Sequence, residues 1–137
     1  MAALPKKTVD EWLDSVDYTW LNNGHYLPGK FALKFMNFIK LVNGSEGEQN
    51  KTPVVHLAML DQIGGTKGKS ANLCFRGAAK TTLMFEYLVL YVAVFGEIDG
   101  FGKVPGMIYV SDSMDNGVKS ARKNIQFRWE NSEVLQE

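Results

Sequence analysis

The residues best suited to chemistry lie in one short junction, which runs from Cys74 to Thr82 and reads CFRGAAKTT. An apolar run precedes this junction, and a long, mostly apolar segment follows it. If the run is a strand and the segment a helix, the backbone N–H groups and the helix dipole at the helix start favour an anion. Lys80 can then reach the outer phosphates of a nucleotide, and the Thr81 hydroxyl can hold Mg²⁺. The junction therefore predicts a phosphate-binding loop.

The junction departs from the standard phosphate-loop pattern, G-x-x-x-x-G-K-[ST]. The two glycine positions of that pattern are occupied by Cys74 and Ala79, and only Gly77 lies inside the loop. From spacing alone, the junction could equally be an ordinary strand-to-helix turn that happens to contain Lys-Thr and binds no phosphate. A second Gly-Lys-Ser sequence at residues 68–70 follows a predicted helix and precedes a predicted strand. Because a phosphate loop needs the reverse order, residues 64–70 are predicted to be a flexible basic loop.

The elements around the junction predict a parallel sheet. Residues 71–75 and 107–110 are apolar runs typical of buried strands, residues 52–63 and 80–95 are predicted helices, and glycine-rich residues 96–106 are a predicted loop. A last helix is predicted after Ser111 or Asp112, with an apolar face made of Met114, Val118, Ala121, Ile125 and Trp129. This order is a βαβα unit. The predicted fold class is α/β, with the partial parallel-sheet core of a P-loop NTPase.

The chain before this core is predicted to be helical. Residues 8–20 open with a capping-box pattern and continue with helical spacing, and residues 31–42 form a second amphipathic helix. Residues 44–51 contain no apolar side chain and are a predicted linker. We therefore expect a helical N-terminal segment with its linker at residues 1–50, and a partial P-loop ATPase domain at residues 51–137.

Composition excludes several classes of protein. The 137 residues are 45% hydrophobic, as is usual for a globular protein. They carry 15 basic and 15 acidic side chains, so the chain lacks the overall positive charge that would indicate nucleic-acid binding. The single cysteine excludes an internal disulfide and a multi-cysteine zinc site. The most apolar stretch, residues 83–95, is interrupted only by Glu86 and is shorter than the roughly 20 residues of a membrane span. We therefore expect a cytoplasmic protein.

The sequence of residues 76–82, RGAAKTT, resembles the deviant Walker A motif of the large terminase subunit of tailed bacteriophages. In that family an arginine precedes the loop and the glycines are partly replaced. The resemblance covers roughly residues 50–137, and it includes the segments TPVVH at 52–56, IYVSDS at 108–113, ARKNI at 121–125 and NSE at 131–133.

The resemblance implies an ATP-driven DNA-packaging motor in the host cytoplasm, acting at the procapsid. Its cofactors would be ATP and Mg²⁺, with Lys80 on the β- and γ-phosphates and Thr81 on the metal. Arg76 would be a candidate catalytic residue that senses or stabilises the γ-phosphate. The nucleotide-binding residues it implies are Gly77, Ala78, Ala79, Lys80, Thr81 and Thr82. Its partners would be double-stranded DNA, the portal protein and the small terminase subunit, and the full-length protein would form a homo-oligomeric ring.

One departure from the family bears on activity. After Val110 no apolar run ends in Asp-Glu, so the Walker B aspartate, the catalytic glutamate and the nuclease carboxylates have no candidates. We therefore expect this chain alone to bind nucleotide without turning it over. Two other interpretations stay open: another P-loop NTPase, of helicase or kinase type, and a catalytically inactive interaction fragment.

Three other reactive side chains are expected to have structural roles, and a fourth, Asp112, has two possible roles. Cys74 has no paired histidine and is predicted to be a buried thiol. His25 and His56 lack metal-ligand spacing and are predicted to lie on the surface or on a helix face. Asp112 follows the second predicted strand, where it could cap a helix or bind a ligand.

Overall fold

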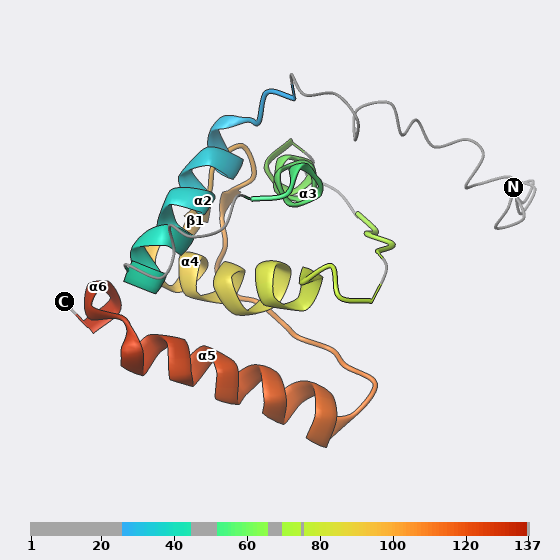
Figure 1. The fold of residues 1–137 in the computed structure, drawn as a ribbon, viewed down its shortest axis with the longest axis vertical. Helices are drawn as coiled ribbons and strands as arrows, with labels where there is room; N and C mark the ends of the chain where they lie inside the picture. Colours follow the sequence, from blue (N-terminus) through green and yellow to red (C-terminus); the bar gives the residue numbers. More distant parts are fainter. Residues whose placement is uncertain (1–25, 45–51, 66–69, 75, 137) are drawn as a thin grey trace, which may run out of the picture.

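The computed structural model describes residues 26–44, 52–65, 70–74 and 76–136 (Figure 1). The predicted helix at residues 8–20 and most of the predicted linker lie outside these ranges. The helices are α2 (Lys30–Asn43), α3 (Val54–Gly65), the π-helical turn η3 (Thr82–Tyr87), α4 (Leu88–Phe95), the π-helical turn η4 (Met114–Lys119), α5 (Ser120–Asn131) and α6 (Glu133–Gln136). The strands are β1 (Glu97–Ile98) and β2 (Gly102–Lys103).

The predicted α/β fold with a parallel sheet is wrong. Within the described ranges the chain is mostly helical, and β1 and β2 form a two-stranded antiparallel sheet. The two runs predicted as buried strands are irregular, and Ile108 and Val110 are 91% and 83% exposed. Strands of a parallel sheet need paired neighbours and helices over both faces. Neither run has such neighbours in the part of the chain that the structure describes, and Leu73, Ile108 and Val110 are left exposed.

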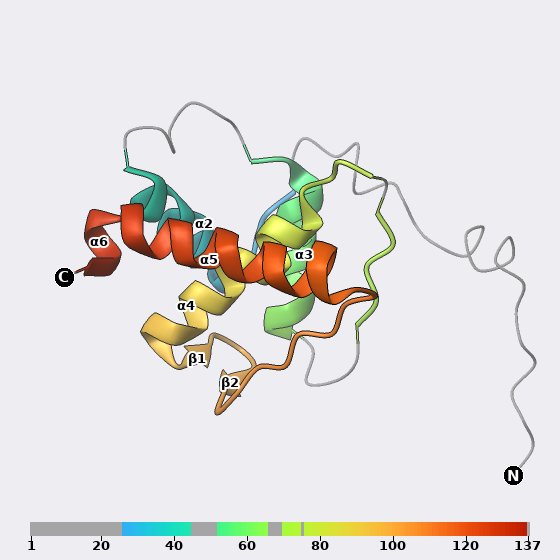
Figure 2. The ribbon, with the colours of Figure 1, turned by 90° about the horizontal axis from the view of Figure 1, so that it is seen from below.

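The sheet lies instead in the glycine-rich segment that was predicted to be a loop. Glu97 pairs with Lys103 and Ile98 pairs with Gly102, which makes a short hairpin at the edge of the molecule (Figure 2). Gly100 in the turn has a φ of +86°, and a Cβ there would lie 2.0 Å from the carbonyl oxygen of Gly64. Only glycine combines this backbone conformation with so close an approach to α3.

The core is built around aromatic side chains of α2 and α4. The ring of Tyr91 lies 5.5 Å, 5.2 Å and 5.4 Å, centroid to centroid, from the rings of Phe31, Phe35 and Phe38. These separations are within the range in which aromatic pairs stabilise beyond their buried area. The predicted helix at residues 31–42 is confirmed as α2, with its phenylalanines packed in the core.

The long helix predicted at residues 80–95 is also confirmed. It begins at Lys80, passes through η3 into α4, and ends at Gly96, whose left-handed backbone caps it. Leu83, Leu88 and Leu90 are buried on it. The helix packs against α2 and α5 and not, as predicted, on a parallel sheet.

Two boundaries differ from the prediction. The helix predicted at residues 52–63 is confirmed as α3, but it continues through Gly64 and Gly65, two residues beyond its predicted end. Ser113 caps the last helical segment by accepting a hydrogen bond from the Asn116 N–H at 3.2 Å, so neither Ser111 nor Asp112 is the cap. On the predicted apolar face of that segment Ala121 is buried, but Met114 and Trp129 remain exposed.

A polar cluster connects η3 to α5, which runs along the long helix in Figure 1 and crosses in front of it in Figure 2. The buried Glu86 carboxylate accepts hydrogen bonds from Asn124 Nδ2 at 2.8 Å and from Arg128 Nε at 2.9 Å. Arg128 also donates to the Tyr87 hydroxyl at 2.6 Å, and that hydroxyl donates to Asn43 Oδ1 at 2.6 Å. Because a buried charge is costly unless it is paired and hydrogen-bonded, this cluster fixes how α5 sits on the long helix.

Candidate phosphate-binding loop

The residues predicted to bind phosphate form one turn and the helical turn that follows it. Gly77 and Ala79 have φ angles of +93° and +52°, and the helix begins at Lys80. The exposed members of this set are Arg76, Gly77, Ala79, Lys80 and Thr81. Ala78 is buried and Thr82 is half-buried. The predicted loop-to-helix junction is therefore present, but an irregular segment precedes it in place of the predicted strand.

The backbone of this turn can bind an anion. A left-handed residue followed by a helical one directs successive N–H groups to one side, and Ala79 and Lys80 have this sequence of conformations. The first N–H groups of a helix also have no partner inside the helix. The first helical turn closes with a hydrogen bond of 3.0 Å from the Leu83 N–H to the Ala79 carbonyl. The N–H groups of residues 79–81 therefore lie beside the exposed side chains of Lys80 and Thr81.

Two side chains of helix α3 contact the loop and the residues just before it. His56 Nε2 lies 2.7 Å from the Ala78 carbonyl oxygen, and the Cys74 thiol lies 4.0 Å from the Met59 sulfur. His56 is therefore on a helix face, as predicted, but its contact with the loop was not predicted. Spacing could not reveal a contact between residues 22 positions apart.

The acidic residues do not form a metal site around the loop. The described residues hold no group of three or more His, Cys, Asp or Glu side chains that could bind a metal ion. Asp112 is exposed, and its Oδ1 accepts a hydrogen bond from the Ser111 hydroxyl at 3.1 Å. The loop offers N–H and ammonium donors, which suit an anion, and within the described residues it lacks the carboxylate cluster that suits a metal held by protein ligands alone.

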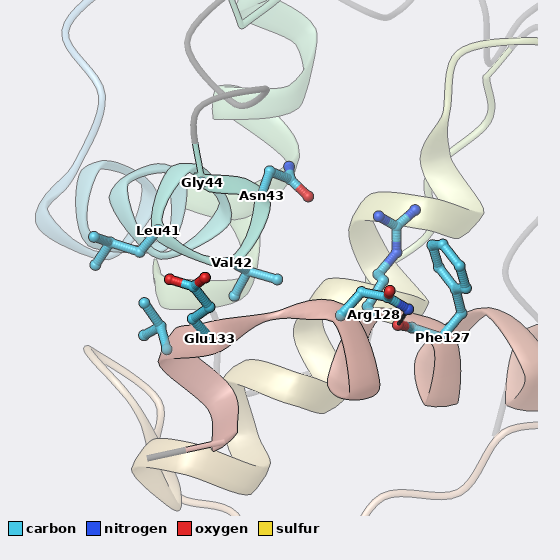
Figure 3. Close-up of a pocket in the computed structure, with 9 residues that line it drawn as sticks. Leu41, Val42, Asn43, Gly44, Phe127, Arg128 and Glu133 are labelled. Carbon is cyan, nitrogen blue, oxygen red and sulfur yellow. Dashed lines mark hydrogen bonds between the residues drawn. The ribbon is translucent and has the colours of Figure 1, made fainter.

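Two cavities lie away from the loop. A cavity of about 570 Å³ is formed where α2, α5 and α6 meet, and Figure 3 shows Asn43 and Arg128 extending into the same space there, with Glu133 nearby. A second, apolar groove of about 520 Å³ runs between the long helix and α5, where Phe85 and Trp129 line it. None of the predicted phosphate-binding residues lines either cavity. The candidate site is an exposed loop.

Replacing Ala79 by glycine should stabilise the protein. Alanine in the left-handed region is strained by about 1 kcal/mol, and glycine adopts it without a steric penalty. Glycine also makes the unfolded chain more flexible, which offsets part of this gain. We expect a net increase of about 0.5 kcal/mol in the free energy of unfolding, measured by urea denaturation. Ala78→Gly, one residue earlier, is the control and should destabilise. An Ala79→Gly protein less stable than the wild type would contradict this backbone conformation.

Comparison of the chain with protein-family models, with curated proteins and with solved structures found no match. No helix within the described ranges has both the length and the hydropathy needed to cross a membrane. The functional interpretation therefore depends on the residues of the loop and on its geometry.

Proposed function

We propose that residues 76–82 bind the phosphates of ATP. The chain would then be the ATP-binding front part of a large terminase subunit, the motor that couples ATP hydrolysis to the movement of DNA into procapsids. The observation that carries this proposal is the exposed turn in which left-handed Ala79 leads directly into a helix that starts with Lys80 and Thr81. Those are the two side chains that a phosphate loop requires at that position.

Each residue of the loop has a distinct task in this proposal. The N–H groups at the helix start hold phosphate oxygens, and the Lys80 ammonium balances their charge. The Thr81 hydroxyl is a ligand for Mg²⁺, which when bound neutralises charge on the outer phosphates. Arg76, at the start of the turn, is exposed and is the candidate for contact with the γ-phosphate. Such an arginine stabilises the charge of phosphoryl transfer.

The charge around the loop supports an anionic ligand. Residues 62–85 contain four basic side chains and no acidic one, although the whole chain has no net charge. The further partners follow from the resemblance alone: double-stranded DNA, the portal protein, the small terminase subunit and other copies in a ring. The corresponding location is the host cytoplasm, at the procapsid during packaging.

A second candidate function, an interaction module without catalysis, is favoured by the apolar groove between the long helix and α5. Its lining includes Phe85, Tyr109 and Trp129. Exposed apolar surface of this kind often marks a site of protein association. Nucleotide binding separates the two candidates, because a pure interaction module shows no saturable, Mg²⁺-dependent binding of ATP.

Replacement of Lys80 by alanine tests the proposal. With a fluorescent ATP analogue and Mg²⁺, we expect Lys80→Ala to weaken binding at least about tenfold, because a charge-assisted contact to phosphate is lost. Lys69→Ala is the matched control from the second Gly-Lys-Ser sequence, and it should change affinity less than about twofold, because it removes one charge from outside the predicted phosphate loop. Loss of binding in Lys69→Ala with unchanged binding in Lys80→Ala would show that the wrong lysine was assigned.

A further inference from the structure

We propose that His56 is a positioning residue, which sets the direction of the phosphate-binding N–H groups by donating a hydrogen bond to the Ala78 carbonyl. This inference rests on the proposed function of residues 76–82. His56 Nε2 lies 2.7 Å from the Ala78 oxygen, and the two residues are 22 positions apart. Because a carbonyl oxygen only accepts, Nε2 must carry the proton in this contact.

The planarity of the peptide bond links this contact to the phosphate side of the loop. In a trans peptide the carbonyl of one residue and the N–H of the next point in opposite directions. No cis peptide bond occurs among the described residues. When His56 holds the Ala78 carbonyl toward α3, the Ala79 N–H must therefore point away from α3. Ala79 and the next residue, Lys80, are both exposed, so this N–H belongs to a part of the turn that an anion can reach.

The hydrogen bond from His56 helps to hold the unfavourable backbone conformation of Ala79. Alanine rarely adopts a φ of +52°, so the surrounding structure must hold the turn in place. Ala78 is only 8% exposed, so its side chain is buried while its carbonyl is bound by His56. These two contacts at one residue fix the peptide that leads into Ala79.

Helix α3 is anchored in the core, so it can hold the His56 side chain in a fixed place. Met59 and Leu60 are buried in the core, and the His56 N–H bonds to the Pro53 carbonyl at 3.0 Å in the first turn of the helix. His56 and Met59 are three positions apart, so they lie on the same face of α3. From that face Met59 contacts Cys74 just before the loop, and His56 contacts the loop itself.

Two substitutions of His56 separate positioning from packing. His56→Leu keeps much of the side-chain bulk but removes the donor, and His56→Gln restores an N–H donor. With the fluorescent ATP analogue and Mg²⁺, we expect His56→Leu to weaken binding about fivefold to tenfold, the scale of one lost hydrogen bond. His56→Gln should recover most of the affinity. Gln62→Leu, an exposed position on the same helix, is the control and should bind as the wild type.

The outcomes distinguish this inference from the function on which it rests. If Lys80→Ala loses affinity while His56→Leu binds as the wild type, the positioning role is wrong and the phosphate loop stands. If Lys80→Ala also binds as the wild type, the proposed function itself fails. If His56→Leu does not fold, His56→Gln decides: near wild-type affinity supports the hydrogen bond, and a loss of fivefold or more overturns it.

Discussion

Replacement of Leu88 by aspartate is expected to unfold the chain. Leu88 is 7% exposed and belongs to the core formed by α2, α3, the long helix, β1 and α6. A carboxylate buried there without a partner costs several kcal/mol, or is forced to bind a proton. Domains of this size have a total stability of about 5–15 kcal/mol, so such a cost removes much or all of it. Circular dichroism during urea denaturation measures the effect.

Val94 offers a matched control on the same helix. It is 49% exposed, so an aspartate at this position keeps its contact with water. Val94→Asp is therefore expected to change the free energy of unfolding by less than about 1 kcal/mol. If the Leu88→Asp protein is soluble and unfolds cooperatively at the wild-type midpoint, the long helix is not buried as the structure has it.

The helices could be predicted because their signals are local. The apolar spacing of residues 31–42 and the glycine that follows it are enough to predict α2. The apolar stretch that ends before Gly96 likewise predicts the long helix. In both cases the structure adds only which neighbours cover the apolar face.

The strands could not be predicted because short apolar runs do not determine strand structure. Residues 107–110 have the composition of a buried strand, but a strand forms only where other strands pair with it. Conversely, β1 and β2 have two residues each, and the turn between them depends on how closely Gly100 approaches Gly64. Such a contact between distant residues leaves no periodic signal.

The candidate site was predictable in part. The spacing of Lys80 and Thr81 at the start of a helix was a correct local prediction, and both side chains are exposed there. The long-range partners were not predictable: His56 meets the loop across 22 residues, and Arg128 meets Glu86 across 42. In the sequence Glu86 only interrupts an apolar stretch, and its burial is explained by its hydrogen bonds to Asn124 and Arg128 on α5.

Replacement of Arg128 by methionine is expected to destabilise the protein by about 3 kcal/mol. Methionine keeps the length and apolar part of the side chain but leaves the Glu86 carboxylate, 4% exposed, without its charged partner. A broken buried ion pair costs about 3–5 kcal/mol. We expect the lower end of this range because Arg128 is itself 25% exposed, so water can partly replace it. Urea denaturation gives the value.

A second substitution tests whether the loss comes from the unpaired carboxylate. Glu86→Leu in the Arg128→Met background removes both charges, and we expect it to restore at least half of the lost stability, because an apolar pair can replace a buried ion pair. Asn124 loses a partner in that protein, but it is exposed and can bind water. Arg122→Met, the same change at an exposed site of α5, is the control and should cost less than about 0.5 kcal/mol. If the double variant is no more stable than Arg128→Met alone, the loss comes from the other contacts of Arg128, which are its hydrogen bond to Tyr87 and its packing over that ring.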